Sequence, residues 1–373
     1  MVLVLVACSV FLVFRISATH AAKKVELLPF TDSPPAWDGS YPYLIISPID
    51  SATKHLNFKS SILLIKPTVR HSSPINEFQV DLHSGLFVLR QTDLFISDVN
   101  PLALTRTYRP WALRNTAFGI GTNHPYDIHP SGTRFPYTYV DLNLEDGRQV
   151  HFPRISKGTG YANAVYRHSE TSSEFYGAQI AWNGNGWTLN FRDGSHFLFP
   201  EAYDAKNDAQ GAVLEMQDAG ARRIQLNRDK RRNLEKLISP SGRTITFKYD
   251  AADRIVEAKD DAGNIRRYFY DASGHLETVA DASNLLYRFV YTPLVQSPGY
   301  DPYLMTAIVD GRGTVLLQNI YRDGMVSEQR LANGDVYLYD YKFLKNEISE
   351  TIVNGPIGMK RFFFQHGILS KQE

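Results

Sequence analysis

Two histidines and one aspartate lie close together in a proline-rich stretch of the sequence. His124, Asp127 and His129 are spaced as neighbours around Pro125 and Pro130. Imidazole nitrogens and carboxylate oxygens are common ligands of zinc. A metal site needs further ligands, and the surrounding residues supply none, so the sequence favours polar loop residues at these positions over a metal centre.

Aspartates that recur in the C-terminal half suggest calcium as a second chemistry. Asp260, Asp261 and Asp281 all lie in segments rich in turn-forming residues. Calcium-binding β-rolls use several glycines in each nonapeptide, whereas these units have one or two in about 21 residues. We therefore expect the carboxylates to cap turns by accepting backbone hydrogen bonds, and we predict neither a metal nor a cofactor.

A basic cluster at Arg222, Arg223 and residues 228–232 could contact phosphate. Asp229 and Glu235 dilute this charge, and the whole chain has 40 basic and 39 acidic residues, with a net charge of +1. No global field therefore attracts nucleic acid or an anionic membrane. The cluster is better explained as the solvated end of a hairpin, and we predict no nucleic-acid partner.

Catalytic motifs are absent from the sequence. There is no Gly-x-Ser-x-Gly elbow, no His-Glu-x-x-His and no phosphate loop. Gly119-Ile120-Gly121 lacks the third glycine of a dinucleotide-binding loop. Cys8 is the single cysteine, which excludes an intramolecular disulfide and a cysteine-based zinc site. We therefore predict that the protein is not an enzyme.

The turn aspartates belong to a sequence repeat. Gly242, Gly263 and Asn284 lie 21 residues apart, as do Tyr249, Tyr270 and Tyr291. A fixed period of this size indicates stacked supersecondary units. Asp250 and Asp271 follow two of the tyrosines and fit the first position of a turn. Two short strands and two turns account for one unit.

The side chains three, five and seven residues after each glycine or asparagine should share one face of a strand, because side chains alternate. In the cleanest units these are Ile245, Phe247 and Tyr249, then Arg266, Tyr268 and Tyr270, then Tyr287, Phe289 and Tyr291, and after Gly334 Tyr337, Tyr339 and Tyr341. About seven such units over residues 219–373 predict an antiparallel sheet with a ladder of aromatic rings. The fold class is therefore all-β.

These units resemble the YD repeats of the RHS and teneurin-like proteins. The Gly-x-x-x-x-x-x-Tyr-Asp core stands at Gly242–Asp250 and Gly263–Asp271. Gly274-His275-Leu276 is similar to the Gly-Arg-Leu that follows this core in the family. The resemblance implies a curved β-hairpin array that is part of a large hollow shell, often around a C-terminal toxin.

Upstream, residues 76–200 are predicted to form a β-rich domain. Gly85, Thr92-Asp93-Leu94 and the run from Pro101 to Tyr108 resemble the uncharacterised domain that precedes RHS repeats in bacteria, although Thr122 stands where tryptophan is usual. We expect residues 201–218 to be a connector, a loop or one short helix. Residues 293–302 are expected to be an insertion in a loop within the repeats.

The N-terminus is apolar over about 14 residues, too short for a membrane span. Residues 1–22 suit a secretory signal with small residues near the cleavage site, although no basic residue precedes the apolar run. The sequence up to Cys8 resembles a lipoprotein box, which leaves lipidation or a buried strand as alternatives. Residues 23–75 read as a proline-punctuated lead-in. The expected location is secreted or in the cell envelope.

The resemblance implies a non-catalytic exported structural protein associated with toxin delivery or cell-surface interaction. Seven units are too few to close a shell, so we expect the N-terminal part of a longer or split architecture. A second polypeptide would complete the sheet, or a toxin would be its cargo. An open strand edge at residues 357–364 would invite such a chain. The alternative is a surface module that binds carbohydrate or protein through the aromatic face.

Overall fold

The computed structural model describes residues 43–44, 62–63, 75–110, 114–170, 173–294, 301–365 and 367–373. All of them belong to one compact unit, Ala36–Glu373. The predicted signal peptide, Cys8 and nearly all of the predicted lead-in lie outside these ranges, as does the middle of the predicted insertion.

A 19-stranded sheet dominates the described residues, and each strand pairs antiparallel with its neighbours in sequence. The predicted all-β class and hairpin array are confirmed. The strands are β11 Val165–Arg167, β12 Gln179–Trp182, β13 Gly186–Asn190, β14 His196–Pro200, β15 Glu215–Gln217, β16 Arg223–Arg228, β17 Leu234–Ile238, β18 Thr244–Tyr249, β19 Ile255–Asp260, β20 Ile265–Tyr270, β21 Leu276–Ala280, β22 Leu285–Pro293, β23 Tyr303–Asp310, β24 Val315–Arg322, β25 Met325–Leu331, β26 Val336–Leu344, β27 Glu347–Gly355, β28 Gly358–Gln365 and β29 Ile368–Gln372.

Three smaller sheets accompany the long one. Their strand orders are β2-β1-β3-β4-β7, β10-β9-β8 and β5-β6. The strands are β1 Tyr43–Leu44, β2 Ile62–Leu63, β3 Leu89–Ile96, β4 Leu102–Tyr108, β5 Asn115–Thr116, β6 Gly119–Ile120, β7 Thr122–Asn123, β8 His129–Gly132, β9 Tyr139–Asn143 and β10 Gln149–Pro153. Two 3-10 turns, η1 Pro125–Asp127 and η2 Asp208–Gly211, are the helical elements of the described residues. None of these residues forms a helix long and apolar enough to cross a membrane.

The long sheet extends beyond the predicted repeat region at its N-terminal end. It begins at Val165, within residues 76–200, and it continues through the predicted connector as β15. Met216 is the reason: it is fully buried and pairs with Ile224 of the next strand, while its neighbours Glu215 and Gln217 are polar. One apolar residue between two polar ones is too weak a pattern to predict a strand.

The predicted open edge at residues 357–364 is wrong. These residues fall largely in β28, which pairs with β27 on one side and β29 on the other. Gly367, with φ +77°, allows the reversal that brings β29 back along β28. Among the described residues, β29 is the strand at this end of the sheet.

Alternation along the repeat strands is as predicted. Phe247, Tyr268, Phe289 and Tyr339 are buried, whereas the intervening Lys248 and others like it are exposed. The glycine positions also match their predicted role: φ is +86° at Gly242, +92° at Gly263 and +87° at Gly334.

Asn284 differs from these glycines, because it does not have a positive φ. Its turn is closed by a bond from Asp281 N–H to the Asn284 carbonyl, three residues on. The matching turn at Asp260 is closed four residues on, at Asn264. The shorter turn removes the left-handed position.

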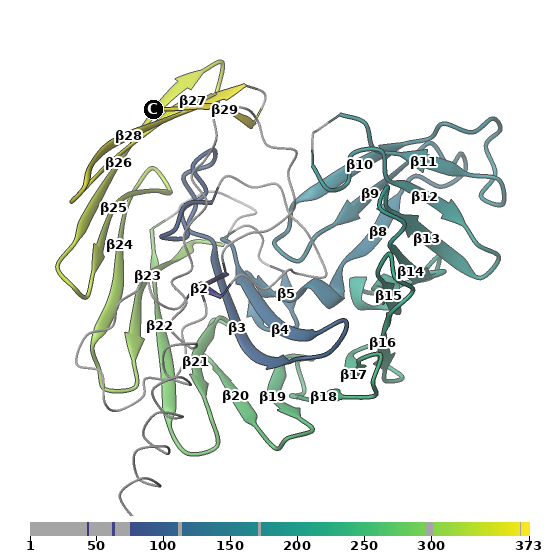
Figure 1. Ribbon diagram of the computed structural model, residues 1–373, viewed down its shortest axis with the longest axis horizontal. Coiled ribbons are helices and arrows are strands. Elements are labelled where there is room, and N and C mark those ends of the chain that lie inside the picture. The colour runs from purple at the N-terminus through teal and green to yellow at the C-terminus, as the bar shows by residue number, and fades with distance from the viewer. Residues whose placement is uncertain are drawn as a thin grey trace, which may run out of the picture. The chain divides into compact units, whose positions relative to one another are not determined.

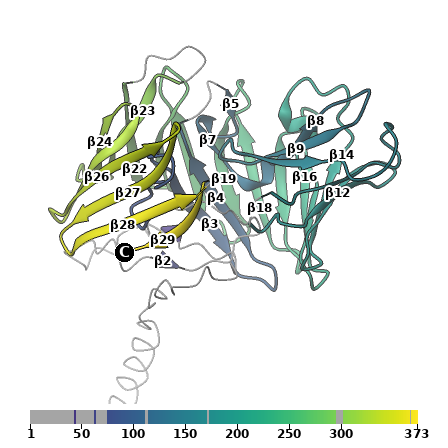
Figure 2. The same ribbon diagram turned by 90° about the horizontal axis from the view of Figure 1, so that it is seen from above.

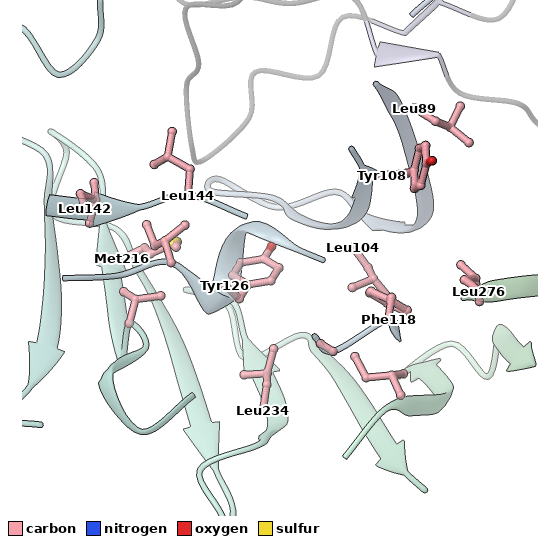
Figure 3. Packing of buried hydrophobic residues seen from close by; sticks show 14 of the residues in the cluster. Leu89, Leu104, Tyr108, Phe118, Tyr126, Leu142, Leu144, Met216, Leu234 and Leu276 are labelled. Carbon is pink, nitrogen blue, oxygen red and sulfur yellow. The ribbon is translucent and has the colours of Figure 1, made fainter. Parts of the chain in front are cut away.

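Residues 76–128, which we call the inner segment, contact the long sheet along strands β16 to β27. The sheet curves around β3 and β4 of this segment (Figures 1 and 2). Figure 3 shows Tyr108 and Phe118 of the inner segment near Leu276 of the repeats, with Tyr126 nearer Leu234. All five belong to one continuous apolar core. The aromatic ladder is therefore packed against the chain itself, so the alternative that it is exposed to bind carbohydrate or protein is not supported.

Candidate functional site

Four of the repeat tyrosines lie at β-bulges. The pairing shifts register beside Tyr249, Tyr270, Tyr291 and Tyr321, so one residue of the returning strand drops out of the ladder. A bulge leaves nearby backbone groups without a partner in the sheet, and a buried group of this kind needs one.

The tyrosine hydroxyls satisfy the carbonyls at these bulges. Each hydroxyl donates to a carbonyl on the strand that precedes it in the sheet. The pairs are Tyr249 with Leu234 at 2.9 Å, Tyr270 with Ile255 at 2.5 Å, Tyr291 with Leu276 at 2.9 Å, Tyr321 with Met305 at 2.7 Å and Tyr341 with Val326 at 2.7 Å. The repeat therefore needs tyrosine rather than phenylalanine, because the ring fills the core and its hydroxyl completes the backbone.

The backbone N–H groups at three of these bulges bind the inner segment. Ile255 N–H donates to the Ala117 carbonyl at 2.7 Å and Val326 N–H to the Gly85 carbonyl at 2.8 Å. Met305 N–H donates to the Tyr108 hydroxyl at 3.1 Å. We call Ile255, Met305 and Val326 the bulge row. Both backbone groups of each are used, the carbonyl by a repeat tyrosine and the N–H by the inner segment.

A buried ion pair reinforces the contact near β20. Arg106 of β4 donates to both carboxylate oxygens of Asp93, and Tyr268 donates to the same carboxylate at 2.8 Å. The guanidinium also lies 5.9 Å from the Phe118 ring centre and 5.5 Å from that of Phe289. Burial, followed by the Asp93 charge, raises the pKa of Tyr268 well above its ordinary value, so this hydroxyl stays a donor.

Polar contacts continue to the far end of the inner segment. Gln329 donates to the Phe78 carbonyl at 3.1 Å and accepts from Tyr339, which itself accepts from Asn76. Thr351 donates to the Leu82 carbonyl at 2.6 Å. The inner segment is thus fixed to strands from β19 to β27 by directional bonds as well as by apolar packing.

His275 lies in a second polar cluster, at the turn after β20. Its Nδ1 is 3.2 Å from Asp271 Oδ2, and its Nε2 is 2.8 Å from Asp301 Oδ2. The ring stacks on Tyr291 at 4.8 Å, and the side chain is 1% exposed. Burial lowers the pKa of the imidazole, but Asp301 and then Asp271 outweigh this effect and raise it above its ordinary value.

The three residues considered for a metal are not arranged to bind one. Arg228 forms an ion pair with the Asp127 carboxylate at 3.2 Å. This carboxylate is therefore already used by a cation and is not free to bind a metal ion. His124 Nε2 lies 3.9 Å from Asp127, and burial lowers the pKa of its imidazole. His129 faces the Asp127 carbonyl through Nδ1. No group of three or more potential ligands among the described residues could hold a metal ion.

The turn aspartates serve the backbone. Asp250 and Asp271 each accept from the N–H two residues on, at 2.9 Å, as the turn pattern predicts. Asp281 does the same with Ser283, and Asp261 pairs with Arg243. In the basic cluster, Arg222 pairs with Asp218, Arg223 with Glu215, Arg228 with Asp127 and Arg231 with Asp253.

The contacts of the inner segment were not found by sequence reasoning. Asp93 and Arg106 interrupt two apolar strands, and a charged residue at a buried strand position indicates an ion pair. That signal was available. The use of the N–H groups at the bulges was not, because it depends on backbone register between segments more than 130 residues apart, as for Ala117 and Ile255.

Two family matches coincide with these two parts of the structure. Residues 78–152 match the domain of unknown function DUF6531, and residues 232–265 and 249–286 match the RHS repeat. The chain is an RHS-repeat protein with a DUF6531 domain. The inner segment lies almost wholly within the DUF6531 match, so the bulge row is the contact between that domain and the repeats.

One curated relative is Double-stranded DNA deaminase toxin A of Burkholderia cenocepacia (strain H111), 23% identical over 190 residues. The match covers 47% of this chain but only 13% of the length of that toxin. Among solved structures, the TcdB2-TccC3-Cdc42 crystal structure is 12% identical, with 75% of this chain and 19% of that chain covered and a TM-score of 0.27. The Photorhabdus luminescens Tc holotoxin pore is 13% identical, covering 72% and 15%, with a TM-score of 0.15.

Proposed function

We propose that this chain is a non-catalytic, exported structural protein that forms part of a β-shell used in toxin delivery. The bulge row carries the proposal. At Ile255, Met305 and Val326, the repeats and the DUF6531 domain complete each other's backbone hydrogen bonds. Backbone hydrogen bonds that are satisfied inside a long curved sheet stabilise that sheet as a wall. The tyrosine ladder, which supplies some of these bonds, then has a structural role.

The buried charges support a structural role as well. Arg106 pairs with Asp93, Arg109 with Asp81 and Arg228 with Asp127. Each of these carboxylates is held by a guanidinium, an arrangement suited to fixing strands rather than to proton transfer. Nucleobase deaminases bind zinc through a histidine and two cysteines. These 373 residues contain one cysteine, so we assign the deaminase chemistry in the relative's name to other parts of that toxin.

The proposed partner is a second polypeptide that completes the sheet, or a toxin carried as cargo. Among the described residues, β29 pairs with β28 alone, so its outer edge is available for another strand. Residues 1–22 are the proposed export signal, with location in the cell envelope or outside the cell.

Co-expression with the polypeptide encoded next to this chain tests the role. We expect the two to co-purify, and the neighbour to resist a protease that digests it when it is expressed alone. A matched variant, Arg106→Leu, removes the buried guanidinium and should weaken this protection by loosening the DUF6531 domain. Equal digestion of the neighbour with and without this chain would exclude the shell.

A direct assay tests the non-catalytic part of the proposal. The purified chain, supplied with zinc, should leave cytosine in double-stranded DNA unchanged. Uracil accumulation above a heat-inactivated control would contradict it.

A further inference from the structure

One repeat turn carries a titratable cation where the preceding turn carries a permanent one. His275 stands 21 residues after Arg254, and Asp271 stands 21 residues after Asp250. Arg254 binds Asp250 and lies over Tyr270 at 4.2 Å. His275 binds Asp271 and stacks on Tyr291, the tyrosine of the following unit. The two sites are the same site in successive repeats.

His275 has a second acid that Arg254 lacks. Asp301 lies two residues before β23, at the end of the connection from β22, and its Oδ2 is 2.8 Å from His275 Nε2. Both carboxylates face a ring nitrogen, and both accept a hydrogen bond only when each nitrogen carries a proton. A neutral imidazole would leave one nitrogen lone pair facing a carboxylate. An imidazolium, with a proton on each nitrogen, therefore satisfies both carboxylates at once.

We propose that His275 is a proton-dependent latch: as an imidazolium it ties the turn at Asp271 to Asp301, just before β23, and loss of the proton loosens this joint. Asp271 is otherwise held by its own turn, through Ser273 and His275 N–H, and Asp301 by Tyr303 N–H. His275 is thus the side chain that joins the two carboxylates across the β22–β23 connection. The inference does not depend on what the sheet encloses.

The surroundings leave His275 as the group that titrates. The ionisable groups that face the imidazole, its carboxylates or its turn are Asp271, Asp301, Tyr291, Tyr303, Tyr108 and Arg254. Burial raises the pKa of both Tyr108 and Tyr291, which keeps them neutral, and Arg254 remains charged. Asp271 and Asp301 are the acids that hold the proton on the ring.

The direction of the pH effect follows from linkage. The pKa of His275 is raised in the folded protein, so the stabilising contribution is complete below the ordinary histidine pKa of about 6.5. It is lost as the pH rises through the folded-state value. The latch is therefore closed in mildly acidic solution and opens toward alkaline pH.

Amide hydrogen exchange of the full chain tests the proposal at the backbone N–H groups that bond to the two carboxylates. The N–H groups of Ser273, His275 and Tyr303 bond directly to Asp271 and Asp301. After correction for intrinsic exchange, we expect their protection to fall between pH 6 and pH 9, by about tenfold for each unit by which the pKa is raised. Protection that is independent of pH at all three amides would overturn the proposal.

Two variants separate charge from structure. His275→Arg copies the Arg254 site and should make protection independent of pH, whereas His275→Gln should give low protection throughout. His151→Gln is the matched control, because His151 forms a comparable pair with Asp141 at 2.7 Å but is 43% exposed. It should leave the three amides unchanged. A pH dependence in His275→Arg equal to that of the natural chain would contradict the latch.

The natural protein gives a test that does not rely on the variants folding. In the full chain labelled at histidine, the His275 ring resonances should titrate above the ordinary histidine pKa of about 6.5. A His275 pKa at or below about 6.5 would overturn the proposal.

Discussion

The turn between β18 and β19 and the turn between β20 and β21 are built on one frame with different cations. In both, an aspartate accepts from the N–H groups two and four residues on, at 2.9 Å. In both, the next tyrosine hydroxyl reaches the carbonyl of the first residue of the returning strand. The frame is set by backbone groups that must be paired, so the repeat preserves it.

The fifth residue of each turn is where the repeats differ. Arg254 has one carboxylate partner and a side chain 21% exposed, whereas His275 has two partners and is 1% exposed. One unit earlier the same position is Asn233, which is neutral and bonds to Asp253. The comparison teaches that the hairpin geometry does not require a particular charge here, so this position can carry a separate property such as pH sensitivity.

The largest expected effect comes from removing the acid that only the second turn has. Asp301→Ala leaves the buried imidazolium with one partner, and breaking a buried pair costs about 3–5 kcal/mol. Urea unfolding should show a lower midpoint with an unchanged slope. Glu328→Ala, which breaks an exposed pair with Arg330, is the control and should cost below about 1 kcal/mol. Equal losses in the two variants would show that the second acid adds nothing.

The shared frame predicts equal losses for two tyrosines. Tyr270→Phe and Tyr291→Phe each leave a backbone carbonyl unpaired, at Ile255 and Leu276, for a cost of about 1–3 kcal/mol. Urea unfolding measures both. Tyr176→Phe, at an exposed tyrosine, should change stability little. A loss of stability in only one of the two variants would show that the two turns do not share this frame.

How much of this was visible in the sequence depends on the range of the interaction. The 21-residue period located the strands, the turn aspartates and the buried face, because each arises from contacts between neighbouring strands. Asn284 misled the prediction, since the residue type tolerates a left-handed backbone but its shorter turn does not use one. The same period also shows that His275 replaces an arginine.

The missing part depended on distant segments. Asp301 lies in the insertion that breaks the period, so no spacing relates it to His275. The partner of the aromatic ladder could not be inferred either, because burial of a face does not say what covers it. The alternative of a ladder exposed for carbohydrate or protein binding stayed open for that reason. Only the fold brings the DUF6531 domain onto it.

A smaller effect is expected from backbone strain in the β20–β21 turn and in its counterpart between β16 and β17. Gly274 has φ +97°, and Arg232 holds the equivalent position two units earlier with φ +71°. Gly274→Ala should cost about 1–2 kcal/mol, because a side chain disfavours this conformation. Arg232→Gly should stabilise by less than about 1 kcal/mol, since the entropy of glycine offsets the relief. Thermal unfolding measures both, and the same sign for the two changes would contradict this explanation.

The smallest effect is a transfer of the pH response. Arg254→His places an imidazole beside Asp250 without a second acid. Exchange protection of the Ala252 amide should then fall as the pH rises from 6 to 9, by less than about tenfold, whereas the natural turn should show no change in that range. In the natural turn the pKa of Asp250 is lowered, because its hydrogen bonds and Arg254 outweigh burial, so its stability is lost only in acid. A response equal to that at His275 would show that Asp301 is unnecessary.

The central claim is that the DUF6531 domain and the RHS repeats complete one another at the bulge row. Amide hydrogen exchange at Ile255, Met305 and Val326 tests it directly, because these N–H groups donate to Ala117, Tyr108 and Gly85. We predict that all three exchange as slowly as amides inside the central strands. Rapid exchange, as expected for unpaired amides at a bulge, would contradict the account.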